Sequence, residues 1–120
     1  MDKKTINSII EDILKGLDKS CIVTLTNPKG VITYANDLFC KISKYSESEL
    51  IGKTHKIVNS GFHSTIFWRK LWNTISSGSV WRGELKNKAK DGSFYWTYAT
   101  IIPQHDSDGT LIKYMAIRSD

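Results

Sequence analysis

Two of the chain's three histidines lie in residues 54–63, THKIVNSGFH, together with a lysine, an asparagine and a Ser-Gly turn. Imidazole, ammonium and amide groups at this density are typical of a ligand site, a catalytic site or a polar loop. We discount a zinc site. His55 and His63 are eight residues apart, His105 lies in a distant turn, and no cysteine or carboxylate completes a tetrahedral set at a familiar spacing.

Catalytic patterns are missing from the sequence as well. Asp106 and Asp108 stand in a predicted exposed turn, and neither a Gly-x-Ser-x-Gly motif nor a glycine-rich phosphate loop occurs. We therefore do not expect an enzyme. Haem is an alternative in principle, with His55 or His63 as the axial ligand, although a histidine at a helix start is more often a surface or capping residue.

The composition is that of one folded domain with no nucleic-acid partner. Of 120 residues, 40% are hydrophobic and 24% are charged, and the formal net charge is +5. The cations do not cluster as phosphate binding requires. Lys86, Lys88 and Lys90 alternate with Asn87 and Ala89, which predicts that the three lysines share the solvent side of a strand.

The cysteines and the lack of long apolar runs predict a cytoplasmic protein. Cys21 and Cys40 have no CxxC spacing and no secretory signal nearby, so we expect reduced thiols. No apolar run approaches the roughly 20 residues that cross a bilayer. We expect no direct membrane contact, and any membrane segment of the parent protein would lie outside this chain.

The elements that position these residues begin with an amphipathic helix, INSIIEDILKGL, which is predicted to end near Gly16. It would dock on its own domain or on a second copy. Its apolar positions are Ile6, Ile9, Ile10, Ile13, Leu14 and Leu17.

A β-hairpin follows, with strands at 21–25 and 31–34 around the turn NPKG. Two short helices come next and end at Ile51-Gly52, the second with a capping box at Ser46 and Glu49. Ser64 is predicted to cap a longer helix that Gly78 closes as its C-cap. The apolar positions of that helix are Phe67, Leu71, Trp72 and Ile75.

Three strands complete the chain, at 80–88, 93–103 and 111–118, joined by two tight turns. The order β-β-α-α-α-β-β-β predicts an α+β fold, in which a five-stranded antiparallel sheet carries the short helices across one face. That face would form a half-open pocket.

The stretch VITYANDLFCKISKYSESELIG resembles the signature of PAS domains, in which a second strand runs into an Asn-initiated helix and then a Tyr, a Glu-Leu and a Gly. The likeness covers nearly the whole chain from residue 20 to 120, including the hairpin WRGELKNKAKDGSFYW. It implies a PAS sensory domain over residues 19–120, preceded by the separate helix at 1–18.

The terminal Ser119-Asp120 resembles the start of the polar motif that links many PAS domains to a following signalling helix. This implies a module of a larger bacterial signalling protein, of the histidine kinase or chemoreceptor type, with a downstream signalling domain.

Within the family, NSGFH and FWRKLWNTISSGSVWRGELKNKAKDG are most similar to the subgroup of flavin-binding redox and aerotaxis sensors, which hold FAD between the helices and the sheet. The resemblance implies flavin contacts at Trp72 of the long helix and Asn87 of the third strand. It places four further residues around the same cavity: Thr24, His55, Lys56 and Asn59.

These residue types suit a flavin. The isoalloxazine ring needs aromatic or aliphatic walls plus an amide such as Asn87, which donates and accepts together, and Lys56 would meet the phosphates. Other interpretations stay open. Trp72 also fits an ordinary core aromatic. The inward Asn87, which would cost about 1 to 3 kcal/mol if unpaired, could bind a ligand, water or a backbone group of the long helix.

A photoreceptor of the light-sensing LOV type is rejected, because His55 holds the position of the reactive cysteine when the chains are aligned on Ile51-Gly52. Two hypotheses remain. The first is a redox or oxygen sensor in which bound FAD changes the hydrogen bonding at Asn87 and shifts the sheet. The second is an interaction module, cofactor-free or with another small ligand. In either case a homodimer through the N-terminal helix and the sheet is expected.

Overall fold

The computed structural model describes residues 2–119, except for the side chains of Asn7 and Ile10. Asp120 of the predicted terminal motif and the predicted apolar position Ile10 therefore lie outside the described residues.

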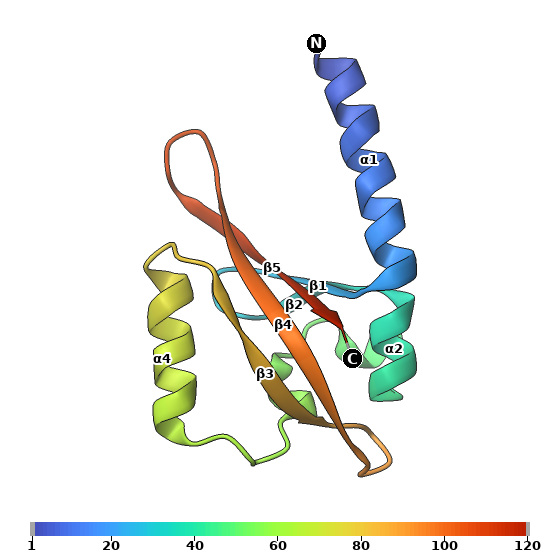
Figure 1. Cartoon of the computed structure of the whole chain (residues 1–120), viewed down its shortest axis with the longest axis vertical. Coiled ribbons are helices and arrows are strands. Elements are labelled where there is room, and N and C mark those ends of the chain that lie inside the picture. Colours follow the sequence, from blue (N-terminus) through green and yellow to red (C-terminus); the bar gives the residue numbers. More distant parts are fainter. Residues whose placement is uncertain (1, 120) are drawn as a thin grey trace.

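Five antiparallel strands form one sheet in the order β2-β1-β5-β4-β3 (Figure 1). The first and last strands of the chain lie side by side, with Thr24 opposite Ala116. The predicted five-stranded antiparallel sheet is confirmed. The strands are β1 (Ile22–Thr26), β2 (Ile32–Ala35), β3 (Trp81–Lys88), β4 (Phe94–His105) and β5 (Leu111–Ser119).

The alternation predicted for β3 is also confirmed. Leu85, Asn87 and Ala89 are buried on the inner face, whereas Lys88 and Lys90 are exposed and Lys86 is half-buried. The period of two of a strand side chain explains the pattern, because one face packs under the helices while the other meets solvent.

Between β2 and β3 the chain forms its helical layer: α2 (Asp37–Ser43), α3 (Glu47–Leu50), the 3₁₀ helix η1 (His55–Val58) and α4 (Thr65–Ser76). Hydrogen bonds from local capping residues fix where these helices begin. Ser46 and Glu49 form the predicted capping box, and Ser64 accepts from the backbone N–H of Phe67. The predicted cap at the end of α4 is one residue off: Ser77 is the C-cap, and Gly78 follows it with φ 94°.

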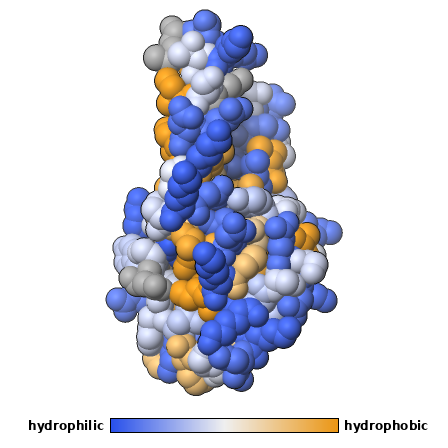
Figure 2. Space-filling view, turned by 90° about the vertical axis from the view of Figure 1, so that its right-hand side faces the viewer, coloured by the Kyte–Doolittle hydropathy of each residue, from blue (hydrophilic) through white to orange (hydrophobic). Residues whose placement is uncertain are grey.

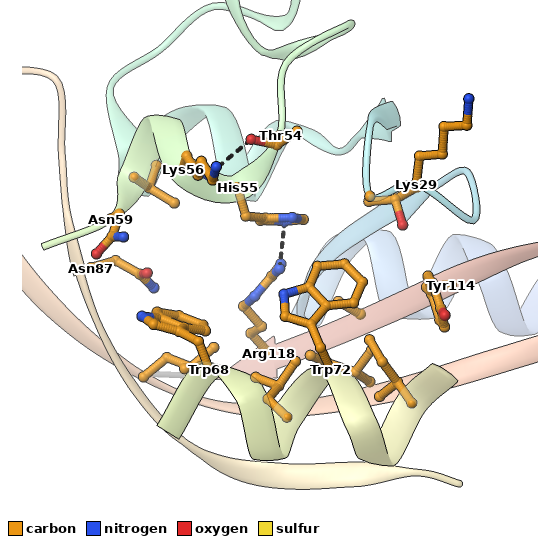
Figure 3. Close-up of a pocket in the computed structure, with 18 residues that line it drawn as sticks. Lys29, Thr54, His55, Lys56, Asn59, Trp68, Trp72, Asn87, Tyr114 and Arg118 are labelled. Carbon is orange, nitrogen blue, oxygen red and sulfur yellow. Dashed lines mark hydrogen bonds between the residues drawn. The ribbon is translucent and has the colours of Figure 1, made fainter. Parts of the chain in front are cut away.

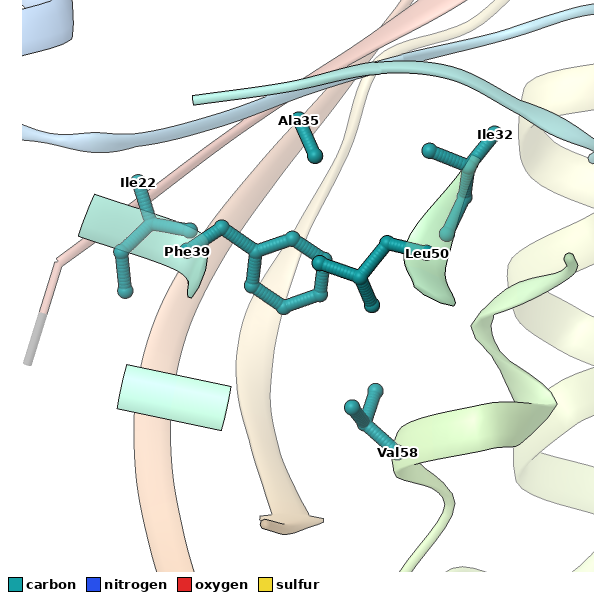
Figure 4. Packing of buried hydrophobic residues seen from close by; sticks show 6 residues of the cluster. All are labelled: Ile22, Ile32, Ala35, Phe39, Leu50 and Val58. Atoms are coloured by element: carbon teal, nitrogen blue, oxygen red, sulfur yellow. The ribbon is translucent and has the colours of Figure 1, made fainter. Parts of the chain in front are cut away.

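Asn36 joins the helical layer to the sheet. Its Oδ1 accepts from the backbone N–H of Phe39, which caps α2, and from that of Val23 in β1. Its Nδ2 donates to the carbonyl of Cys21 at 2.8 Å. The hydrophobic cluster beside it packs side chains of β1 and β2 against those of α2, α3 and η1 (Figure 4). That cluster consists of Ile22, Ile32, Ala35, Phe39, Leu50 and Val58.

The N-terminal helix α1 (Lys3–Ser20) projects away from the domain (Figure 1). The predicted end near Gly16 is wrong. The interior glycine costs only about 1 kcal/mol relative to alanine, and the last turn gains contacts, because the Tyr34 hydroxyl donates to Asp18 at 3.0 Å. Figure 2 shows apolar side chains along the projecting helix. The exposed ones are Ile6, Ile9, Ile13 and Leu14.

Within residues 2–119, no helix has the length and apolar character needed to span a membrane. Cys21 and Cys40 are free, as predicted.

Candidate functional site

A cavity of about 470 Å³ lies between α4, η1 and the inner face of the sheet (Figure 3). This volume falls within the range of small-molecule sites in proteins. The walls are mostly apolar, with a few polar groups among them. The apolar lining side chains are Val58, Trp68, Leu71, Trp72, Ile75, Leu85, Ile101, Tyr114 and Ala116.

Asn87 supplies an amide to this wall. The residue is 7% exposed, and its side chain makes no hydrogen bond to any residue that the structure describes. The predicted alternative in which the backbone of α4 binds the amide is therefore wrong. Asn59 forms a β-bridge with Asn87, and Figure 3 shows their two side-chain amides close together at one end of the cavity.

Arg118 supplies a buried cation. It is 5% exposed, and its guanidinium lies 5.4 Å from the ring centroid of Phe39. Nη1 donates to Oγ1 of Thr24 at 3.2 Å, and Nη2 donates to Nε2 of His55 at 2.7 Å. No carboxylate pairs with it among residues 2–119. Burial lowers the pKa of Arg118 to about 10, so the group stays charged at neutral pH.

The geometry defines the protonation of His55. A guanidinium can only donate, so Nε2 of His55 must accept, and the ring proton resides on Nδ1. The Thr24 hydroxyl, 3.3 Å away, then donates to the same Nε2. Burial, and secondarily the charge of Arg118, lowers the pKa of His55 to about 3. His55 is therefore neutral at physiological pH.

Five of the six predicted site residues line the cavity: His55, Lys56, Asn59, Trp72 and Asn87. Thr24 does not, and this expectation is wrong. It is fully buried behind the side chains of Arg118 and His55, whereas Thr26, on the same face two residues later, reaches the cavity.

Trp72 belongs to the mouth of the cavity rather than to the core. It is 42% exposed and meets Tyr114 edge to face at 6.0 Å between ring centroids. A Cβ on Gly30 would come within 2.9 Å of the indole ring, so the β1–β2 turn can approach Trp72 only with glycine there. The same turn brings Lys29 to the mouth (Figure 3).

Sequence reasoning missed Arg118, Trp68, Lys29 and Tyr114. A signal for Arg118 existed in the sequence, because Tyr114, Ala116 and Arg118 alternate on the buried side of β5. An arginine on an inward strand position marks a functional site or an unusual core.

The described residues contain no group of three or more histidine, cysteine or acidic side chains that could hold a metal ion. His63 lies outside the cavity wall and against aromatic side chains of α4.

A family model of the PAS domain matches residues 19–120. The chain belongs to the PAS domain family. The predicted family is thereby confirmed. The aerotaxis receptor of Escherichia coli (strain K12) is 32% identical to this PAS domain over 102 residues. The nitrogen fixation regulatory protein of Klebsiella pneumoniae is 32% identical over 101 residues.

These matches cover 85% and 84% of this chain but only 20% of each relative. The PAS domain thus spans about a fifth of the length of these receptor and regulatory proteins. A light-oxygen-voltage domain, solved in a study of a flavin analogue, superimposes with a TM-score of 0.81, with 21% identity over 90% of this chain and 83% of that one. At this identity the likeness shows the fold.

Proposed function

We propose that this PAS domain is the sensory module of a larger bacterial signalling protein, of the histidine kinase or chemoreceptor type, and that it senses redox state or oxygen through FAD. One observation carries the proposal. The amide of Asn87 and the guanidinium of Arg118 face a cavity with mostly apolar walls, and neither is fully used by protein partners in the described chain.

The residues fit a flavin in chemical type. The polar edge of an isoalloxazine ring presents acceptors and donors, which an amide matches in both directions and a guanidinium matches at acceptors. Trp68 and Trp72 supply aromatic wall, and Lys29 and Lys56, both exposed at the mouth, supply charge for phosphates. When bound, the flavin would supply reversible electron transfer.

Asn87 and Arg118 also offer a route for a signal. The Asn87 amide can reverse its hydrogen-bond direction by rotating, whereas Arg118 can only gain or lose an acceptor. Arg118 belongs to β5, the last strand of the domain, and it links that strand to η1 through His55. A ligand state that favours one arrangement would shift the population of β5 conformations, which a downstream domain would register.

The relatives support a sensor of this kind. One is named an aerotaxis receptor, and the light-oxygen-voltage structure comes from work on a flavin analogue.

An absorbance spectrum of freshly purified protein tests the proposal. We expect the yellow colour of oxidised flavin, with FAD released on denaturation and identified against FMN by chromatography. Trp72→Ala and Asn87→Ala should each lower the flavin content in a protein that remains folded. A Soret band would instead establish haem. A colourless protein that also fails to take up added FAD would contradict the flavin proposal.

A cofactor-free interaction module is the second candidate, favoured by the apolar surface that the domain exposes. Ile9 and Ile13 on α1 are 44% and 56% exposed, and the outer face of β4 presents Phe94, Trp96 and Tyr98. We propose that two copies pair through α1 and this outer face. Such a dimer is compatible with an occupied cavity, since the cavity lies on the inner face.

A further inference from the structure

The backbone N–H and carbonyl of Lys86 both bind side chains of the loop at 59–63. Ser60 Oγ donates to the Lys86 carbonyl at 2.6 Å, and the Lys86 N–H donates to Nε2 of His63 at 2.9 Å. β3 is an edge strand of the sheet, so these backbone groups have no neighbouring strand to pair with. The loop takes the place of that strand.

The loop is built to hold those two side chains in place. Oδ1 of Asn59 accepts from the N–H of Gly61 at 2.8 Å, and Gly61 has φ 79°, which closes a tight turn. Ser60 Oγ also accepts from the N–H of Phe62 at 3.2 Å. The imidazole of His63 stacks on Phe67, with centroids 4.1 Å apart and planes inclined by 16°.

The clamp on Lys86 lies next to the amide pair of the cavity. Asn59 precedes Ser60, and Asn87 follows Lys86, so the bridge between the two asparagines is continuous with the clamp. Releasing Ser60 and His63 from Lys86 would leave the isolated bridge to hold Asn59 against β3, while the Asn59 N–H still donates to the Lys56 carbonyl at the end of η1.

We propose that Ser60 and His63 are positioning residues that clamp the backbone N–H and carbonyl of Lys86, hold Asn59 beside Asn87 at one end of the cavity, and release when His63 takes up a proton. We expect release of the clamp to speed the exchange of a bound ligand, and this consequence rests on the proposed flavin function. The clamp itself does not.

The proton dependence follows from hydrogen-bond chemistry. Because the Lys86 N–H is a donor, Nε2 of His63 must carry a lone pair, whereas a protonated imidazole has donors at both nitrogens. Protonation would set two donors against each other. Burial lowers the pKa of His63 below its ordinary 6.5, in agreement with a neutral ring in the folded domain.

The groups around His63 do not offset this effect. Four uncharged aromatic rings contact it, and the ammonium of Lys86 lies over two rings of the same region, 5.2 Å from the Phe62 centroid and 4.6 Å from the Phe94 centroid. The other charged side chains of α4 and β3 are exposed. The contacting rings are Phe62, Phe67, Trp68 and Trp96. The exposed charged residues are Arg69, Lys70, Arg82, Glu84 and Lys88.

The sign of the pH dependence is fixed by the lowered pKa. The folded domain favours neutral His63 more than the unfolded chain does, so this contribution to stability is complete above the ordinary pKa of 6.5. It is lost as pH falls from there through the lowered folded value. The clamp should therefore open in mild acid.

Hydrogen exchange at the Lys86 amide tests the clamp without any ligand. Protection factors would be measured by NMR from about pH 8 to about pH 5, the interval in which histidines titrate. In the wild type, we expect protection of Lys86 to fall about five- to tenfold as His63 becomes protonated, which is the value of one hydrogen bond. The amide of Val23, whose acceptor is Oδ1 of Asn36, serves as the non-titrating reference.

Four variants separate the roles of His63 and Ser60. His63→Gln keeps an acceptor and should give protection with little pH dependence, whereas His63→Ala should lose protection at every pH. Ser60→Ala should weaken the clamp, and Ser60→Thr, which retains the hydroxyl, should restore it. Unchanged Lys86 protection in folded His63→Ala, or a wild-type profile without pH dependence, would overturn the inference. If His63→Ala does not fold, the test is the comparison of the wild type with His63→Gln: the inference requires that Lys86 protection depends on pH in the first and hardly at all in the second.

Dissociation of FAD from the loaded protein supplies the second readout. The rate should rise in mild acid for the wild type and remain nearly flat for His63→Gln. A protein that binds no FAD would refute the proposed function while leaving the exchange result valid. A protein that binds FAD with a release rate identical in His63→Ala and wild type would refute the positioning role.

Discussion

The guanidinium of Arg118 donates across 2.7 Å to Nε2 of His55, which joins the last strand of the sheet to the first residue of η1. These residues are 63 positions apart in the chain, and together they form the polar floor of a cavity that is otherwise largely aromatic and aliphatic. A change of hydrogen bonding in the cavity would therefore act directly on the strand that ends the domain.

Removing the guanidinium should weaken flavin binding. Arg118→Met keeps the apolar stem of the side chain but loses the charged donors, and a hydrogen bond from a charged group contributes about 1.5 to 3 kcal/mol, or roughly 10- to 100-fold in affinity. Titration of the apo protein with FAD, followed by flavin fluorescence, measures the change. Arg118→Lys should lie in between, because a lysine keeps charge without the planar fork.

Arg82→Met is the matched control for this experiment. Arg82 is exposed on β3 and does not line the cavity, so its removal should leave the affinity unchanged. Wild-type affinity in Arg118→Met that remains folded would show that the guanidinium does not contact the ligand.

His55 should stay neutral throughout the physiological pH range. Burial is the main cause of its low pKa of about 3, and the charge of Arg118 is the second cause. NMR titration of the imidazole should thus show no protonation from about pH 8 to about pH 5. In Arg118→Met the pKa should rise but remain below 6.5, since burial persists. An unperturbed titration of His55 in the wild type would contradict the geometry.

Replacing Asn87 by an apolar residue should weaken FAD binding and slightly stabilise the apo domain. Its amide has no hydrogen-bond partner in the described chain but opens onto the cavity, so Asn87→Leu, which is similar in size, removes only part of a desolvation cost and should stabilise the apo domain by at most about 1 kcal/mol. The same change should weaken FAD binding at least tenfold. Thermal or urea unfolding and FAD titration measure the two effects.

Asn73→Leu, at an exposed site on α4, should alter neither quantity appreciably. Destabilisation of the apo protein by Asn87→Leu would indicate that the amide is already satisfied in the folded domain.

A charge on the apolar face of α1 should separate the proposed dimer. Ile13 is 56% exposed, and Ile13→Glu would place a carboxylate within the paired surface, where burial without a partner is costly. Sedimentation velocity over a range of concentrations should show monomers for Ile13→Glu. Lys15→Glu, exposed on the same helix, should leave the dimer intact. A wild-type protein that is monomeric at all concentrations would exclude pairing through this face.

Much of the fold could be predicted because its signals are local. The capping box of Ser46 and Glu49 acts within one turn, and the alternation that buries Leu85 and Asn87 is a property of the strand backbone itself. The inward Asn87 followed from that alternation alone. Element ends were less predictable. The interior Gly16 did not end α1, because contacts to another part of the chain hold its last turn in place.

By itself, the sequence determined the order of the elements, the face that each strand buries and the family, since these depend on periodicity and on motifs read along the chain. Only the tertiary structure decided which residues meet at the site. Thr24 and Thr26 share one strand face, yet the side chain of Arg118, from the far end of the chain, covers the first and leaves the second open to the cavity. Likewise, Lys86 shows no chemistry in the sequence, and its backbone N–H and carbonyl gain importance because the loop carrying Ser60 and His63 folds against a sheet edge. Such pairings depend on long-range packing, which no spacing along the chain records.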